Sequence, residues 1–162
     1  MFVAEDVVGD ADEPRYADRA RHYVDIGWGD AAKHRQLAST DTGVTTRITL
    51  PRGTFLRAGA VIFDDGEQVV VVRRPPEPAI AVEFAANVGA IRQLVLLGYV
   101  LGNQHAPIEI DDHGLTAPLF TSAGAAESML ADMGVIGEVA AVALAADGWS
   151  RTSAEDHAGH RH

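Results

Sequence analysis

The chain has 162 residues, of which 47% are apolar and 22% are charged, so its composition is that of a globular protein with a buried core. It has no cysteine, which excludes thiolate metal sites and disulfides and leaves His, Asp and Glu as the metal ligands. The net charge is −10, and residues 76–150 hold nine acids and one base. We expect no nucleic-acid partner, because phosphate contacts need Lys and Arg.

Two further exclusions concern membranes and export. The longest apolar candidate is interrupted by Arg92 and Gln93, so no stretch reaches the roughly 18 apolar residues of a membrane span. The N-terminus lacks a basic region followed by an apolar one, as a secretory signal would have. The sequence therefore predicts a cytoplasmic protein without a membrane partner.

The first half of the chain reads as short strands. Residues 22–28 and 44–50 alternate apolar and polar side chains, and the second stretch is rich in β-branched residues. Residues 60–63 and 68–72 are apolar runs joined by a turn containing Asp65-Gly66, which predicts a hairpin. Residues 1–76 are thus expected to form a small all-β domain.

A proline-rich stretch, PPEPAI at residues 75–80, is expected to end strand pairing and mark a boundary. The pattern beyond it is β-α-β-β-α-β, typical of the ferredoxin-like split βαβ fold. Residues 77–147 are therefore predicted to form a ferredoxin-like domain, which makes the fold class α+β. The expected elements are strands at 79–84, 106–110, 115–120 and 135–144, with helices at 86–101 and 122–134.

The first of these helices is unusual, because from Leu94 onward it is apolar on every side. Such a helix needs a sheet on one face and another partner on the other, and a second subunit is the simplest choice. Residues 148–162 are polar, contain Gly and Ser, and show no strand or helix period, so they are predicted to form a mobile tail.

Histidines are the candidate functional residues. His105 follows the apolar helix, which is expected to end at Gly102, and is read either as a capping or packing residue or as a metal ligand shared across a two-fold axis. The tail carries His157, His160 and His162, a spaced tract typical of metal binding, with a cloning tag as the alternative. The remaining histidines are predicted to be surface residues. His22 and His34 are isolated among polar neighbours, and His113 belongs to an exposed acidic turn that could also help to hold a metal.

Several stretches together resemble the urease accessory protein UreE family, which are nickel metallochaperones. The matching sequences are HYVDIGWGDAAKHR, LPRGTFLRAGAVIFDDGEQVVVV, LGNQHAPIEI, ESMLADMGV and the His-bearing tail. The resemblance covers nearly the whole chain, and LGNQHAP is its most specific element.

The resemblance implies an N-terminal β domain of the partner- or peptide-binding type and a C-terminal domain for metal binding and dimerisation. It implies that His105 from both subunits of a homodimer binds Ni(II), and that His157, His160 and His162 capture or pass on further metal. The implied partners are the urease accessory GTPase and the urease pre-activation complex. Imidazole ligands also suit Zn(II) and Cu(II), which are alternatives in vitro.

This chain departs from the family pattern at three places, one of which is Ala58-Gly59-Ala60 in place of the usual acidic pair around the glycine before the hairpin. Gln104 replaces the usual Arg before the motif histidine, and residues 118–128 lack the HDH-like element found at the start of the second helix in many members. The sequence therefore predicts a non-catalytic nickel carrier for urease assembly. The alternatives are a metal-free scaffold that docks partners or a small ferredoxin-like hydrolase, although no nucleophile–base pair lies near His105 in the sequence.

Overall fold

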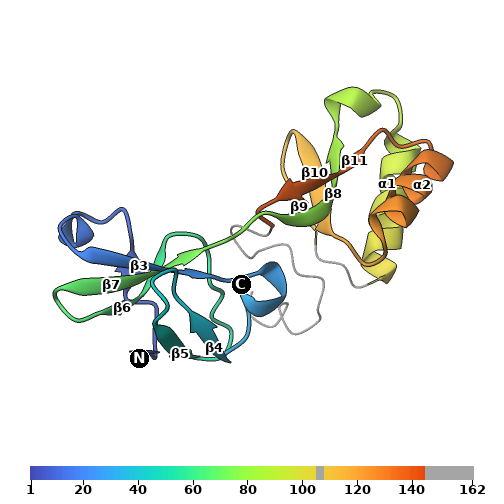
Figure 1. Ribbon diagram of the computed structural model, residues 1–162. Coiled ribbons are helices and arrows are strands. Elements are labelled where there is room, and N and C mark those ends of the chain that lie inside the picture. The colour runs from blue at the N-terminus through green and yellow to red at the C-terminus, as the bar shows by residue number, and fades with distance from the viewer. Residues whose placement is uncertain (105–107, 145–162) are drawn as a thin grey trace, which may run out of the picture. The chain divides into compact units, whose positions relative to one another are not determined.

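The computed structural model of the chain describes residues 1–104 and 108–144 (Figure 1). The chain divides into two compact units, Met1–Pro75 and Pro76–His162. Each unit has its own hydrophobic core.

Two sheets make up the N-terminal unit. One is four-stranded, in the order β2-β6-β7-β3, and the other is three-stranded, in the order β1-β5-β4. The strands are β1 (Phe2–Ala4), β2 (Gly9–Asp10), β3 (Ala20–Asp25), β4 (Arg35–Ser39), β5 (Thr45–Thr49), β6 (Ala60–Asp64) and β7 (Gln68–Arg73). Short 3-10 turns at Pro14–Tyr16 and Trp28–Asp30 connect some of them.

The hairpin predicted around Asp65-Gly66 is confirmed, because β6 and β7 pair antiparallel. Its turn is held locally: the backbone N–H of Gly66 donates to Asp64 Oδ1, and those of Glu67 and Gln68 donate to Asp65 Oδ1. Gly66 has φ +94°, a conformation that favours glycine. The apolar side chains of the two strands then enter the unit's core, which includes Ile62, Val70 and Val72.

The C-terminal unit has the order β-α-β-β-α-β. Its elements are β8 (Glu77–Glu83), the 3-10 turn Ala85–Asn87, α1 (Ile91–Asn103), β9 (Glu109–Ile110), β10 (Gly114–Pro118), α2 (Ala123–Met133) and β11 (Glu138–Val142). The sheet order is β11-β8-β10-β9, with every neighbouring pair antiparallel. This is the split βαβ arrangement, and the α+β class predicted from the sequence is confirmed.

Both helices cover the same face of this sheet (Figure 1). Ile80, Val82 and Leu115 of the sheet pack with Leu97, Leu101, Ala126 and Leu130 of the helices in one core. Because side chains alternate along a strand, Ala81 and Thr116 belong to the opposite face, where they line an open pocket.

The boundaries of α1 differ from the sequence-based prediction of 86–101. The helix begins at Ile91, because Gly89 adopts φ +85°, a backbone conformation that does not continue a right-handed helix from the turn Ala85–Asn87. It also continues through Gly102 to Asn103, so the prediction that Gly102 ends it was wrong. Gly102 is not among the glycines with positive φ, whereas Gly134 ends α2 in the left-handed conformation as predicted.

Pairing in β7 ends at Arg73, before Pro75 and Pro76, as the proline-rich stretch predicts, whereas Pro78 lies within a paired strand, contrary to expectation. Strand β8 begins at Glu77 and includes Pro78, which lies opposite Ala141 of β11. Pro78 is tolerated because the pairing with β10 stops one residue later, at Ala79 opposite Pro118, so only one neighbouring strand lies beside it.

Within the described part of the chain, no helix has both the length and the apolar character needed to cross a membrane.

Candidate metal-binding surface of the C-terminal unit

The four predicted metal ligands, His105, His157, His160 and His162, lie outside the described residues, so the structure does not test them. The residues on either side of positions 105–107 of the LGNQHAP motif are placed. Leu101 is fully buried, the backbone N–H of Gln104 donates to Val100 O at 3.1 Å, and Ile108 packs against the core. The chain entering and leaving the motif is therefore anchored on the core of the C-terminal unit.

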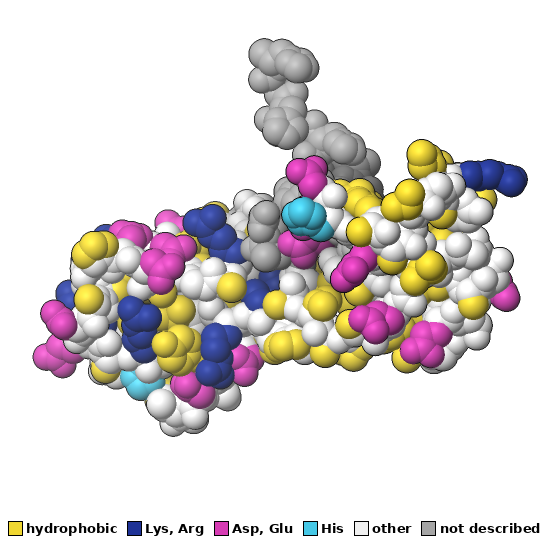
Figure 2. Space-filling model, turned by 90° about the horizontal axis from the view of Figure 1, so that it is seen from above, with side chains coloured by type: hydrophobic (Ala, Val, Ile, Leu, Met, Phe, Trp, Pro, Cys, Tyr) yellow, Lys and Arg dark blue, Asp and Glu magenta, His cyan; other side chains and the backbone are white. Residues whose placement is uncertain are grey.

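Helix α1 carries an exposed apolar stripe directly before this motif. Ile91, Val95 and Tyr99 follow one another at four-residue spacing and are 73%, 65% and 73% exposed. Gly98 and Gly102 flank the stripe, and a Cβ added at either position would meet no other atom within 4 Å. Figure 2 shows that several hydrophobic side chains are exposed on the surface of the protein. Another helix can approach such a surface closely, because the glycines leave room for it.

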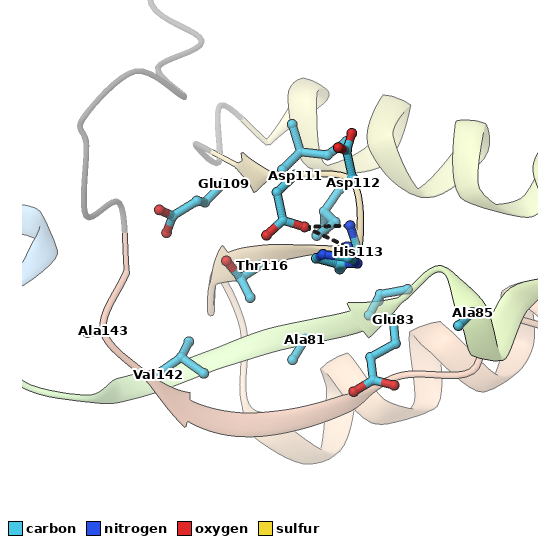
Figure 3. Close-up of a pocket in the computed structure, with 14 residues that line it drawn as sticks. Ala81, Glu83, Ala85, Glu109, Asp111, Asp112, His113, Thr116, Val142 and Ala143 are labelled. Atoms are coloured by element: carbon cyan, nitrogen blue, oxygen red, sulfur yellow. Dashed lines mark hydrogen bonds between the residues drawn. The ribbon is translucent and has the colours of Figure 1, made fainter.

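An open pocket of about 750 Å³ lies on the helix-free face of the sheet (Figure 3). Four carboxylates and one imidazole contribute to its walls: Glu83, Glu109, Asp111, Asp112 and His113. Apolar and small side chains of β8, β10 and the end of β11 form the rest, among them Ala81, Thr116, Val142 and Ala143. Its charged lining is thus almost entirely acidic.

The turn that bears His113 is held by the residue two positions before it. Asp111 Oδ1 accepts hydrogen bonds from the backbone N–H groups of His113, at 2.7 Å, and Gly114, at 2.9 Å (Figure 3). These two donors, and then the nearby His113, lower the pKa of Asp111 below its ordinary value. The backbone oxygen of His113 also accepts from the N–H of Phe84 at 2.8 Å, which fixes the turn against the end of β8.

Gly114 allows the turn to lie close to β8. A Cβ at this position would stand 2.5 Å from the backbone oxygen of Val82, so a larger residue would push the strands apart. The exposed His113 side chain is consequently presented from a rigid turn beside β8.

The pocket by itself does not provide a complete metal site. Among residues 1–104 and 108–144, no group of three or more His, Cys, Asp or Glu side chains is arranged to hold a metal ion. Its acidic lining attracts cations, and His113 supplies one nitrogen ligand. A metal held here would need ligands from elsewhere.

The other described histidines lie in the N-terminal unit. The sequence suggested that His22 is isolated, and this prediction was wrong. Its Nδ1 lies 2.6 Å from Thr42 Oγ1, and its Nε2 lies 2.9 Å from Gln68 Oε1. Its ring also lies 5.0 Å from that of Phe2. His22 is therefore a structural residue, whose partners come from separate parts of the chain. His34 is half-buried, and its backbone oxygen accepts from the N–H of Leu50.

Helix α2 begins without histidines, as the sequence showed. Ser122 caps the helix by accepting from the N–H of Ala125 at 3.3 Å. The position at which many family members are expected to carry the HDH-like element is thus a helix cap in this chain.

Comparisons with known proteins show which protein family the chain resembles. Residues 4–74 match the family model "UreE urease accessory protein, N-terminal domain". This match confirms the resemblance to the UreE family that the sequence predicted, and it places a UreE-type N-terminal domain at these residues.

Individual relatives carry the same name. The chain is similar to the urease accessory protein UreE of Burkholderia lata, with 37% identity over 108 residues that cover 67% of this chain and 47% of that protein. It is 33% identical over 91 residues to the UreE of a Polaromonas species, covering 56% of this chain and 41% of that protein. For the UreE of Verminephrobacter eiseniae, identity is 34% over 91 residues, covering 56% of this chain and 54% of that protein.

The chain spans about half the length of the curated relatives it matches. The alignment with the Burkholderia lata protein is longer than Met1–Pro75, so it extends into the C-terminal unit.

Proposed function

We propose that this protein is a nickel-binding metallochaperone that delivers Ni(II) during assembly of the urease active site and catalyses no reaction of its own. The observation that carries the proposal is the similarity to urease accessory proteins UreE, which begins in the N-terminal domain and extends into the C-terminal unit. The proposed partners are the urease accessory GTPase and the urease pre-activation complex. The proposed compartment is the cytoplasm.

The proposed cargo site uses His105 from two copies of the chain. Residue 105 follows within two positions of Asn103, the last residue of α1, and the exposed stripe on α1 supports a helix-to-helix contact between copies. A residue near a two-fold axis meets its own copy, so one position supplies two imidazoles. Two ligands leave coordination positions open, which suits a carrier that must release its metal.

Further Ni(II) is proposed to bind His157, His160 and His162 in the polar C-terminal segment. Imidazoles also accept Zn(II) and Cu(II), and ligand type alone does not select nickel. Selection in this proposal comes from the partners that supply and receive the ion.

A metal-free docking scaffold is the second candidate. The observation that favours it is that the start of α2 carries a serine cap and no histidine. A scaffold would retain the N-terminal domain and the dimer contact but would bind no Ni(II) tightly.

Calorimetric titration with Ni(II) separates the two candidates. The carrier is expected to bind one tight Ni(II) per dimer, and His105→Ala should abolish that site. His34→Ala is the matched control, because His34 lies in the N-terminal unit, and it should bind nickel as the unchanged protein does. Tight binding that survives His105→Ala would contradict the site assignment, and no tight binding in the unchanged protein would favour the scaffold.

A further inference from the structure

Strand β4 is an edge strand of the three-stranded sheet in the N-terminal unit, whose order is β1-β5-β4 (Figure 1). Just before the strand, the N–H of Leu50 donates to His34 O at 2.8 Å. Just after it, the N–H of Thr40 donates to Val44 O at 2.9 Å. Hydrogen-bonded pairs alternate along an antiparallel ladder, so the even-numbered residues of β4 bond to β5 and the odd-numbered ones direct their N–H and C=O groups to the outer edge.

The open part of this edge lies at Arg35 and Leu37. Within residues 1–104 and 108–144, no group bonds to the outward backbone atoms of either residue. Thr40 forms a bridge to Val24 of β3, which closes the edge beyond the end of β4. The N–H and C=O groups of Arg35 and Leu37 are therefore available to a further strand.

The side chains on the outer face of β4 and β5 are basic and apolar. Leu37 is 70% exposed and lies opposite Arg47, and Arg35 lies opposite Thr49 at the next position on this face. Both arginines are exposed, and no carboxylate of the described residues lies within ion-pair distance of them. The surrounding chain shares this charge, because residues 31–57 hold five bases and one acid in a protein of net charge −10.

These features together select an extended, acidic segment as the partner. An open edge pairs with the backbone of an added strand, and the positive face favours carboxylates beside Arg35 and Arg47. A second copy of β4 would bring the same positive charge to the edge and is disfavoured. Protection of the edge from aggregation is the alternative role of such arginines, and it predicts no binding of an acidic strand.

We propose that β4 is a docking site for an extended acidic segment of a partner protein, which adds to the sheet beside Arg35–Leu37 and places its carboxylates on the face that carries Arg35 and Arg47. A fitting segment has acidic side chains at alternate positions, because alternate side chains of a strand share one face. The inference goes beyond the proposed function, since neither a histidine nor a metal takes part. It gives the N-terminal unit a ligand chemistry of its own.

Fluorescence anisotropy of a short labelled peptide in which Glu and Val alternate tests the charge requirement. The unchanged protein should bind it, whereas Arg35→Glu and Arg47→Glu should each weaken binding at least about fivefold, because each replaces an attraction with a repulsion. Arg92→Glu reverses an exposed arginine of the C-terminal unit and should bind as the unchanged protein does. The proposal is overturned if the unchanged protein does not bind the peptide, if both arginine variants bind it equally well, or if a peptide with Lys in place of Glu binds as tightly.

Two substitutions at Leu37 test the backbone edge. Leu37→Pro removes the outward N–H without removing a bond to β5, and proline is tolerated at such an edge position. Leu37→Ala keeps this N–H and shortens only the side chain. The proline variant should bind the Glu–Val peptide at least about fivefold more weakly than the alanine variant, because a donor is lost and the added strand is obstructed. Circular dichroism and thermal unfolding check that both variants are folded.

A modified peptide gives the same test on the unchanged protein. Methylation of alternate backbone nitrogens in the Glu–Val peptide keeps its charge and removes its edge donors, so binding should weaken at least about fivefold. Equal binding of the methylated peptide, or equal competition by single-stranded DNA of matched charge, would show attraction of anions alone and overturn strand addition.

Nickel binding separates this proposal from the proposed function. Arg47→Glu should bind Ni(II) as the unchanged protein does, and His105→Ala should bind the Glu–Val peptide as the unchanged protein does. A missing nickel site would contradict the carrier alone, whereas a missing peptide complex would contradict the docking site alone.

Discussion

The side chain of Asn87 joins the turn before α1 to the loop before β11 by bonding to Ile136 in both directions. Asn87 Nδ2 donates to Ile136 O at 2.7 Å, and Ile136 N donates to Asn87 Oδ1 at 2.8 Å. Nδ2 also donates to Glu83 O at 2.8 Å, and the residue is 5% exposed. One buried amide therefore satisfies three backbone groups and ties the turn before α1 to the loop before β11.

Replacing Asn87 with alanine should destabilise the C-terminal unit. The substitution leaves one N–H and two carbonyls without their partner, at an expected cost of about 2–4 kcal/mol. Urea unfolding measures the change. Asn103→Ala, at the exposed end of α1, is the matched control and should stay within about 0.5 kcal/mol of the unchanged protein. A similar stability of the two variants would show that the amide is not needed.

The exposed stripe on α1 should control dimerisation. Tyr99→Glu places a charge in the proposed interface and is expected to shift the protein from dimer to monomer, as light scattering after size-exclusion chromatography would show. Thermal stability of the monomer fold should change little, because Tyr99 is 73% exposed. Leu37→Glu, on β4 at 70% exposure, should leave the dimer intact. A dimeric Tyr99→Glu variant would place the interface elsewhere.

Nickel binding should weaken steeply below about pH 6. Imidazole binds metal only when neutral, and its ordinary pKa is about 6.5, so protons compete with the metal below that value. Titrations between pH 8 and about 4.5 measure the dependence. Affinity that stays constant over this range would indicate carboxylate ligands in place of His105.

Asp111 should contribute stability that depends on pH in the acid range. Its pKa is lowered by two backbone N–H donors, so the folded state favours the ionised carboxylate. The contribution is present above the ordinary value of 3.8 and is lost as the pH falls through the lowered value. Asp111→Asn should thus reduce the denaturation midpoint at pH 7, and the difference from the unchanged protein should shrink in strong acid.

The neighbouring Asp112 provides the control for this experiment. It is also exposed but makes no side-chain hydrogen bond to the described residues, so Asp112→Asn should have a smaller effect at pH 7. Equal effects of the two substitutions would attribute the result to net charge.

The features that the sequence predicts correctly are those set by interactions between residues close together in the chain. The hairpin at Asp65-Gly66 and the limits of α2 depend on contacts within a few residues, such as the Ser122 cap and the left-handed Gly134. Alternating and helical patterns also indicated the α+β class and the order of elements in the C-terminal unit. The family resemblance predicts that the histidine of the LGNQHAP motif and the tail histidines are metal ligands, and the resemblance itself is confirmed.

Only the tertiary structure decided the features that depend on distant pairing. The turn before α1 is held by Asn87 bonding 49 residues ahead. Pro78 is tolerated in β8 because β11 alone lies beside it, and His22 finds a partner 46 residues away. The pocket likewise depends on register, because pairing places Glu109 opposite Thr116 and Thr116 opposite Ala81. Such contacts form only when strands far apart in sequence align, so side-chain periodicity within one segment does not reveal them.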